Sequence, residues 1–308
     1  MKKLIPITIL VLLLFAACGQ SYEETKRITR EQRREAWRKD SAALKIAVMP
    51  TLDCLPLFVA QQYELFDTAN GGVRLKFYNA QMDCDTAIQR GRVEGAVTDL
   101  VRAMRIDKQG LKMRYVAATN AYWQLVTNRN ARIKQLKQLD DKMVAMTRFS
   151  VTDLLTDIAR DTVKLAPERV FKVQINDLNV RMQMLLNNEI DALWLPEPLA
   201  TQARVLKHPV IMDSRDLKLQ LGVLAFRYQE MLRKERAKQL ALFMQAYNQA
   251  CDSINKYGVA YYRKIFIDRY KLKATLVDSI PKDIRFQHAQ SPRQEDVTVV
   301  EKWLNVEG

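Results

Sequence analysis

Polar side chains that could bind a small solute follow three short apolar runs in the first hundred residues. The first run opens the stretch KIAVMPTLDCLPLFVAQQYELF, residues 45–66, where a strand-like run, a turn and a helical run with Pro56 in its first turn succeed one another. Strand ends that lead into helices form the ligand crevice of open α/β sheets. Carboxylates placed there accept strong, charge-assisted hydrogen bonds from an amine. The candidate binding residues of this part are Thr51, Asp53, Cys54, Gln81, Asp83, Thr98 and Asp99.

The same rule predicts a second set of candidates at strand ends later in the chain. Several candidates have a structural alternative: Asp83, or Thr98 with Asp99, could simply cap a helix. Ser150 and Thr152 are also cap candidates, which is compatible with presenting N–H groups to a ligand. Trp194 could be a core residue, and Glu197 a turn residue before Pro198. Arg148 could bind a carboxylate or point to solvent. The candidates of this part are Arg148, Ser150, Thr152, Asn176, Trp194 and Glu197.

Residues suited to catalysis are sparse. The chain has two histidines, His208 and His288, which are far apart in sequence. It contains no G-x-S-x-G, H-E-x-x-H or C-x-x-C motif. A cysteine–histidine pair has nothing in the sequence to support it. We therefore expect a binding protein without catalytic site, metal or cofactor. A ligand sensor that takes no part in transport would have the same sequence features, so that alternative stays open, and an enzyme on the same fold is the less favoured one.

The N-terminus has the pattern of an export signal. Lys2 and Lys3 precede an uncharged apolar run at residues 4–17, which is shorter than the roughly 20 residues that span a bilayer. The run ends in LFAAC, which resembles a bacterial lipobox with Phe15 where leucine is usual. That resemblance implies a signal peptide at residues 1–17 and a lipid on Cys18. The alternative is an ordinary signal peptide in which this cysteine occurs by chance.

A polar tether is expected at residues 18–43, after the lipidated cysteine. It is rich in arginine and lysine, interrupted by glutamates, and has no apolar stripe. It could be a solvated spacer, partly helical, or could lie on anionic lipid headgroups. The net charge of +14 does not require a nucleic-acid partner, because the chain has no glycine-rich phosphate loop, zinc-finger spacing or RNA-binding motif.

From residue 44 onward, strand-like and helical patterns alternate, which predicts α/β architecture with mainly parallel sheets. The alternation restarts near residue 141, and this indicates a second lobe of similar build. We expect lobe one to comprise residues 44–126 and 219–308, and lobe two residues 127–218. The chain would then cross between lobes near residues 126–128 and 217–219, which are the expected hinges.

Five stretches in order resemble periplasmic substrate-binding proteins of ABC importers, of the sulfonate, nitrate, taurine and thiamine-precursor type. They are residues 45–66, RGRVEGAVTD at 90–99, residues 136–152, LNNEIDA with Glu197-Pro198, and residues 299–308. The resemblance implies a type II periplasmic-binding-protein fold, with two hinged lobes closing on a small molecule. It also implies a monomer that delivers this ligand to an ABC permease, anchored by lipid in the cell envelope and facing the periplasm or exterior.

One departure from that family concerns the ligand. Its sulfonate and nitrate binders are rich in glycine, serine and threonine near the first loop, whereas this chain has Asp53, Asp83 and Asp99 near its strand ends. Carboxylates in a closed cleft repel an anion. The departure favours a neutral or cationic ligand, such as an amine or a heteroaromatic compound.

The fold that the resemblance implies also suggests a disulfide. Cys54 and Cys84 follow strands that would be neighbours in a parallel sheet, so both loops would emerge at one edge. Export would place them in an oxidising compartment. The predicted bridge is Cys54–Cys84, with Cys251 left as a buried thiol. Two reduced cysteines packed as small apolar residues are the alternative.

Overall fold

The computed structural model describes residues 22–307, so the predicted signal peptide and Cys18 lie outside the described residues. The described residues divide into two units, one ending at residue 43 and the other beginning at residue 44. In the first, the segment expected to be a partly helical tether is one continuous helix, α2 (Tyr22–Ala42). The helix is stabilised locally by i,i+4 ion pairs such as Lys39–Glu35, which are 2.7 Å apart. Its tryptophan, Trp37, is 73% exposed.

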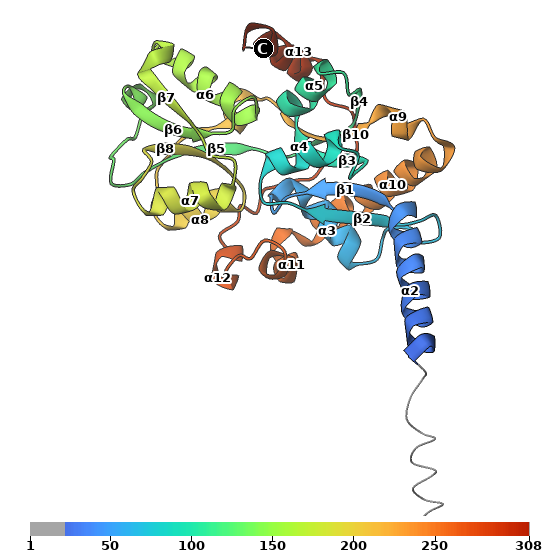
Figure 1. Cartoon of the computed structure of the whole chain (residues 1–308). Coiled ribbons are helices and arrows are strands. Elements are labelled where there is room, and N and C mark those ends of the chain that lie inside the picture. The colour runs from blue at the N-terminus through green and yellow to red at the C-terminus, as the bar shows by residue number, and fades with distance from the viewer. Residues whose placement is uncertain (1–21, 308) are drawn as a thin grey trace, which may run out of the picture. The chain divides into compact units, whose positions relative to one another are not determined.

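The second unit contains two five-stranded sheets, one for each lobe (Figure 1). The sheet of lobe one has the order β2-β1-β3-β10-β4. Strand β1 is parallel to β2 and β3, whereas β10 is antiparallel to β3 and β4. The strands are β1 (Leu44–Val48), β2 (Val73–Phe77), β3 (Gly95–Asp99), β4 (Met113–Thr119) and β10 (Gly222–Arg227).

The sheet of lobe two repeats this arrangement in the order β7-β6-β8-β5-β9. Strand β6 is parallel to β7 and β8, and β5 is antiparallel to β8 and β9. The mixed character has one cause in both sheets. Strands β5 and β10 each enter from the other lobe, at the edge where the parallel strands end, so they run the opposite way. The strands are β5 (Trp123–Thr127), β6 (Lys142–Met146), β7 (Val170–Gln174), β8 (Ala192–Pro196) and β9 (Val210–Asp213).

Helices cover both faces of each sheet. In lobe one, α3 and α10 pack on one face, and α4, α5 and α13 on the other; in lobe two, α6 lies opposite α7 and α8 (Figure 1). The main helices are α3 (Leu55–Gln62), α4 (Gln81–Gln89), α5 (Leu100–Lys108), α6 (Val151–Thr162), α7 (Leu178–Leu186), α8 (Leu199–Val205), α10 (Lys234–Tyr257) and α13 (Gln294–Glu307). Short helices complete the unit: η1 (Leu52–Cys54), η2 (Leu136–Leu139), η3 (Pro167–Arg169), η4 (Ser214–Leu217), α9 (Tyr228–Met231), η5 (Val259–Tyr262), α11 (Arg263–Asp268) and α12 (Ala274–Val277).

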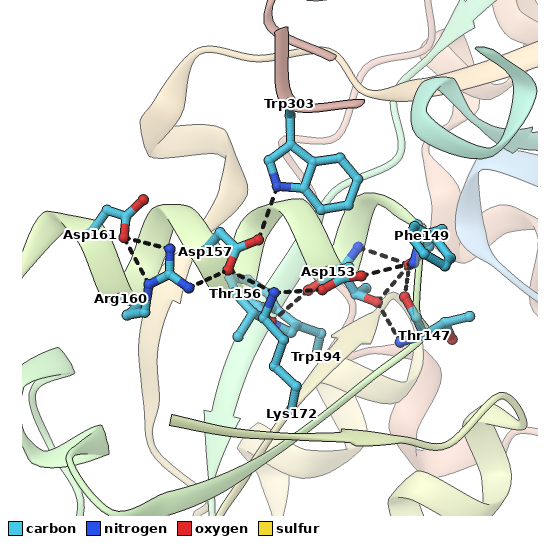
Figure 2. A network of polar contacts seen from close by, with 12 residues as sticks. Thr147, Phe149, Asp153, Thr156, Asp157, Arg160, Asp161, Lys172, Trp194 and Trp303 are labelled. Carbon is cyan, nitrogen blue, oxygen red and sulfur yellow. Dashed lines mark hydrogen bonds and ion pairs between the residues drawn. The ribbon is translucent and has the colours of Figure 1, made fainter. Parts of the chain in front are cut away.

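The last helix joins the two lobes. It packs on α5 of lobe one, and the indole nitrogen of Trp303 donates a hydrogen bond to Asp157 on α6 of lobe two at 2.9 Å (Figure 2). Within residues 22–307, no helix combines the length and the hydrophobicity needed to cross a bilayer.

The predicted lobe boundary at residue 126 is wrong. Strand β5 pairs over its whole length with β8 of lobe two, so the chain leaves lobe one earlier, between Thr119 and Trp123. The return crossing lies between Leu217, at the end of η4, and Gly222, at the start of β10. The expected hinge at residues 126–128 therefore falls inside lobe two. Only residues 217–219 lie near a crossing.

The predicted disulfide is also wrong. Cys54, Cys84 and Cys251 are all free and buried. Cys54 packs in the same cluster as Val48, on the α3 side of the sheet, whereas Cys84 packs in the cluster of Ala47, on the α4 side. Successive residues of a strand face opposite sides of a sheet. The two thiols follow neighbouring strands but lie on opposite faces, and burial raises the pKa of both above the usual range.

Candidate functional site

A cavity of about 60 Å³ lies where the two lobes meet, at the carboxyl ends of β1, β3, β6 and β8. This is the crevice that open α/β sheets use for ligands. Hydrogen bonds cross it: the amide of Leu52 in lobe one donates to the carbonyl of Glu197 in lobe two at 3.0 Å. The lobes are therefore in contact across the cavity. Nine of the predicted residues line it: Thr51, Asp53, Gln81, Thr98, Asp99, Ser150, Thr152, Asn176 and Glu197.

Asp53 is a buried carboxyl group on the lobe-one wall. It lies in η1, directly after β1, and is 6% exposed. The hydroxyl of Thr119, at the end of β4, donates to it at 3.2 Å. Burial raises its pKa, and the hydroxyl groups of Thr51 and Thr119 oppose that rise. Among the described residues, no cationic side chain lies within ion-pair distance of Asp53.

Asp99 connects the two lobes. It is the last residue of β3 and the N-cap of α5, where one carboxylate oxygen accepts from the amide of Arg102 at 2.9 Å. The same oxygen accepts from the amide of Val151, the first residue of α6 in lobe two, at 3.2 Å. Burial raises its pKa to about 7, against the opposing effect of Arg102. Asp99 therefore caps α5, as the alternative held, and it also lines the cavity and accepts a hydrogen bond from the first residue of α6 in the other lobe.

The raised pKa of Asp99 makes stability depend on pH. In the unfolded chain, the Asp99 carboxyl has its ordinary pKa of about 4. Between about pH 4 and pH 7, this carboxyl therefore holds a proton in the folded state that it has lost in the unfolded state. The free energy of unfolding contributed by this group therefore falls as pH rises through that window. We expect Asp99→Asn to remove this fall. Urea unfolding at pH 5, 6, 7 and 8 should show the wild type losing stability relative to the variant up to about pH 7. Parallel profiles for the two proteins would contradict the assignment.

The lobe-two wall includes the first turn of α6. Ser150 is the N-cap of this helix and its hydroxyl oxygen accepts from the amide of Thr152 at 3.1 Å. That hydroxyl also donates to the carbonyl of Thr147 at 2.6 Å, and the amide of Thr147 donates to the Thr152 hydroxyl at 2.9 Å. Ser150 thus caps the helix and lines the cavity at once, and Thr152 lines the cavity from the first turn of the helix. Figure 2 shows Thr147 and Phe149, which precede this turn, beside the polar network along α6.

Arg181 is a cavity residue that the sequence prediction missed. It lies on α7 and is 1% exposed. Its guanidinium donates to the carbonyls of Ile175 and Trp194 at 2.6 and 3.1 Å, and to the hydroxyl of Thr147. Burial, helped by the like charge of Arg102, lowers its pKa to about 9. Within residues 22–307 no carboxylate forms an ion pair with it. The sequence feature that could have identified it is a single charged residue, an arginine, in the largely apolar segment LNVRMQMLL.

Glu197 lines the cavity, but its charge is already neutralised. Its carboxylate accepts from the Tyr122 hydroxyl at 3.0 Å, from the amide and hydroxyl of Thr201 at 2.9 and 2.6 Å, and from Arg204 at 2.6 Å. This supports the structural alternative for the residue. The sequence prediction did not include Tyr122 among the cavity residues, because it placed the crossing between the lobes near residues 126–128. Residues 120–123, where the chain does cross between the lobes, all line the cavity.

Four predicted residues do not line the cavity. Cys54 and Trp194 are core residues with no exposed surface, and the indole nitrogen of Trp194 donates to Thr156 at 2.9 Å. Asp83 lies on the exposed side of α4, and Arg148 is exposed, with its guanidinium over the Phe149 ring at 5.2 Å. The structure thus supports the alternatives that Trp194 is a core residue and that Arg148 points to solvent.

The described residues that line the cavity offer hydrogen-bond donors and acceptors, but among them no nucleophilic side chain is hydrogen-bonded to a histidine base. Neither histidine lines it: His208 accepts from the amide of Arg129, and His288 pairs with Asp252 on the surface. The described residues contain no group of three side chains suited to hold a metal ion. The arrangement is suited to binding a polar solute with Asp53 on one side and Arg181 on the other.

Comparison with known proteins identifies a matching family and solved structures with a similar fold. The sequence model of the family described as "NMT1/THI5 like" matches residues 51–258. The alkanesulfonate-binding protein of Xanthomonas axonopodis pv. citri, bound to MOPS, is 14% identical, with a TM-score of 0.73 over 86% of this chain and 92% of that one. A ligand-binding component of an ABC-type import system from Staphylococcus aureus is 18% identical, with a TM-score of 0.70 and the same coverage. The nitrate-binding protein of Synechocystis is 14% identical, with a TM-score of 0.66 over 83% and 74%. No curated protein matches the sequence.

Proposed function

Because the chain belongs to the NMT1/THI5-like family, we propose that it is a solute-binding protein that captures a small molecule between its lobes and delivers it to an ABC importer. Three solved proteins with this fold are described as binding components of importers or as binders of alkanesulfonate or nitrate. The interlobe cavity, lined by polar groups from both lobes, is where such a solute would be held. Hinge closure on a ligand is the motion expected of this architecture.

The ligand that we propose is neutral or cationic and carries an N–H donor. The buried Asp53 carries this inference, because its neighbours include hydroxyl groups but no cationic side chain of the described residues. A ligand amine or ring N–H would satisfy it with a charge-assisted hydrogen bond. Glu197 needs no such partner, since Arg204 already pairs with it. Arg181 offers donors to a ring nitrogen or carbonyl of the ligand, and an amino-substituted heteroaromatic compound has both kinds of group.

Asp53→Asn tests this proposal because it removes the charge with little change in size. In calorimetric titrations with a panel of amines, aminopyrimidines, sulfonates and nitrate, the wild type should bind an amine or aminopyrimidine. The substitution should weaken that binding at least tenfold, since hydrogen bonds to charged groups contribute about 1.5–3 kcal/mol. The matched control, Asp83→Asn, changes an exposed aspartate of α4 and should bind as the wild type does. Micromolar binding of a sulfonate or nitrate, without binding of amines or pyrimidines, would refute the proposed ligand class.

We further propose that the mature protein is monomeric and is held in the cell envelope by lipid on Cys18. The support is the lipobox-like end of the apolar run at residues 4–17. Helix α2 would then act as a polar spacer between the anchor and the binding unit, and its largely exposed side chains are consistent with that role. Mass spectrometry of the N-terminal peptide checks the anchor: an unmodified Cys18, or cleavage at another site, would exclude it.

A further inference from the structure

Helix α2 gathers arginines on one of its sides. The segment is helical over its whole length (Figure 1), so residues spaced three, four, seven and eight apart lie on the same side. At about 100° per residue, five side chains with this spacing occupy a sector of roughly 140°. We call this sector the arginine face, and its members are Arg30, Arg33, Arg34, Trp37 and Arg38.

Over residues 30–38 the arginine face contains no carboxylate. Its five side chains are all exposed, with Trp37 73% exposed. The two glutamates of this stretch, Glu31 and Glu35, lie outside the sector and pair with Arg27 and Lys39. Among the described residues, no ion pair involves an arginine of this face. Four positive charges and one indole ring are therefore presented to solvent together.

Charge and position favour an anionic lipid surface as the partner of this face. Phosphate headgroups complement exposed arginines, and each basic residue near such a surface strengthens binding about fivefold. Tryptophan is enriched where headgroups meet hydrocarbon, because its ring is amphipathic. The proposed anchor, Cys18, precedes the helix start at Tyr22 by four residues, which span at most about 14 Å. A lipid on this cysteine would keep the helix at the membrane surface.

We propose that α2 lies along the membrane with its arginine face on anionic phospholipid headgroups. This inference rests on the anchor proposed for Cys18 and is independent of the solute that the protein binds. The helix has 21 residues and is therefore about 32 Å long. Lying flat, it keeps the unit that begins at residue 44 near the membrane, whereas a helix directed away from the surface would hold that unit at a distance. The solute is then released close to the permease proposed to receive it.

Chemical anchoring of the mature chain, residues 18–308, tests this contact without requiring that the cell attach a lipid. Cys18 is coupled to a maleimide lipid in vesicles, because the other three thiols are buried and react slowly. The vesicles contain brominated phosphatidylcholine, with or without phosphatidylglycerol, and bromine quenches an indole at the lipid interface. The emission of Trp37, obtained by difference from Trp37→Phe, should be quenched on the anionic vesicles only. It should recover in about 0.5 M salt, which screens the attraction.

A triple variant separates the arginine face from the net charge of the chain. Arg30→Gln, Arg33→Gln and Arg34→Gln together should lower the equilibrium constant for surface contact at least tenfold, since each charge contributes about fivefold. The matched control removes three exposed arginines of the other unit and should change this constant less than twofold. Its substitutions are Arg90→Gln, Arg114→Gln and Arg148→Gln.

Three results would overturn the proposal: equal quenching of Trp37 on neutral and anionic vesicles, full quenching in the triple variant of the face, or an equal loss in the control. The anchor is checked separately by mass spectrometry of protein from the cell envelope. Quenching on anionic vesicles together with an unmodified Cys18 in the cell would support the arginine face and refute the anchor.

Discussion

Replacing Glu197 with alanine should lower the free energy of unfolding by about 3–5 kcal/mol, the usual cost of removing one partner from a buried ion pair. Its side chain is 1% exposed, and Arg204, its ionic partner, is 28% exposed. The substitution also removes the acceptor for Tyr122 and for the amide and hydroxyl of Thr201. Urea unfolding monitored by circular dichroism would measure the loss.

Two further variants identify the cause of that loss. Glu197→Gln retains one side-chain oxygen as an acceptor and should cost less than the alanine variant, although the ionic partner is lost. Glu168→Ala removes an exposed glutamate of the same lobe and should change stability by less than about 0.5 kcal/mol. If Glu197→Ala were as mild as Glu168→Ala, the carboxylate would not be the centre of a stabilising network.

Replacing Trp194 with alanine should cost about 3–5 kcal/mol, because it leaves a large cavity in the core. The side chain has no exposed surface, lies in the core cluster shared by the two lobes, and donates to Thr156. Chemical unfolding again measures the loss. Trp37→Ala, on α2, is the matched control: that side chain is 73% exposed, and its loss should be nearly neutral.

Trp194→Phe separates a core role from the binding role that the sequence suggested. This variant keeps most of the apolar volume, so the protein should remain folded, at a cost of about 1–3 kcal/mol for the smaller ring and the lost hydrogen bond. A solute bound in the interlobe cavity should keep its affinity within about twofold. A tenfold loss of affinity in a folded Trp194→Phe protein would show that the indole contacts the ligand after all.

The placement of Asp99 and Asp83 shows how far local sequence reaches. Both were predicted to lie in the cleft because each follows a strand. Asp99 is itself the last residue of β3 and the N-cap of α5, so the strand end directs it to the cavity. Asp83 lies inside the first turn of α4, and rotation about the helix axis places it on the exposed side. The sequence correctly predicted that both aspartates lie near the edge of the sheet where the parallel strands end. Which of the two faces the cavity depends on where the following helix begins.

The cysteines and the lobe boundary depended on contacts between distant segments. Which face of the sheet a helix covers is decided when the helix packs, and α3 and α4 pack on opposite faces, so Cys54 and Cys84 lie apart. Strand β5 looks like any other apolar run in sequence. Only its pairing with β8 assigns it to lobe two and brings residues 120–123 to the cavity.

By itself, the sequence determined the two-lobe α/β architecture, most element positions and the strand ends where polar residues gather, because hydrophobic period, proline and capping residues act locally. The tertiary structure alone decided that Trp194 is core, that Arg204 neutralises Glu197, and that Arg181 reaches the cavity. Arg181 donates to groups near the carboxyl ends of three different strands, β6, β7 and β8. Those acceptors are up to 47 residues apart in sequence, from Thr147 to Trp194, and only folding of the whole lobe brings them within hydrogen-bond distance of one guanidinium.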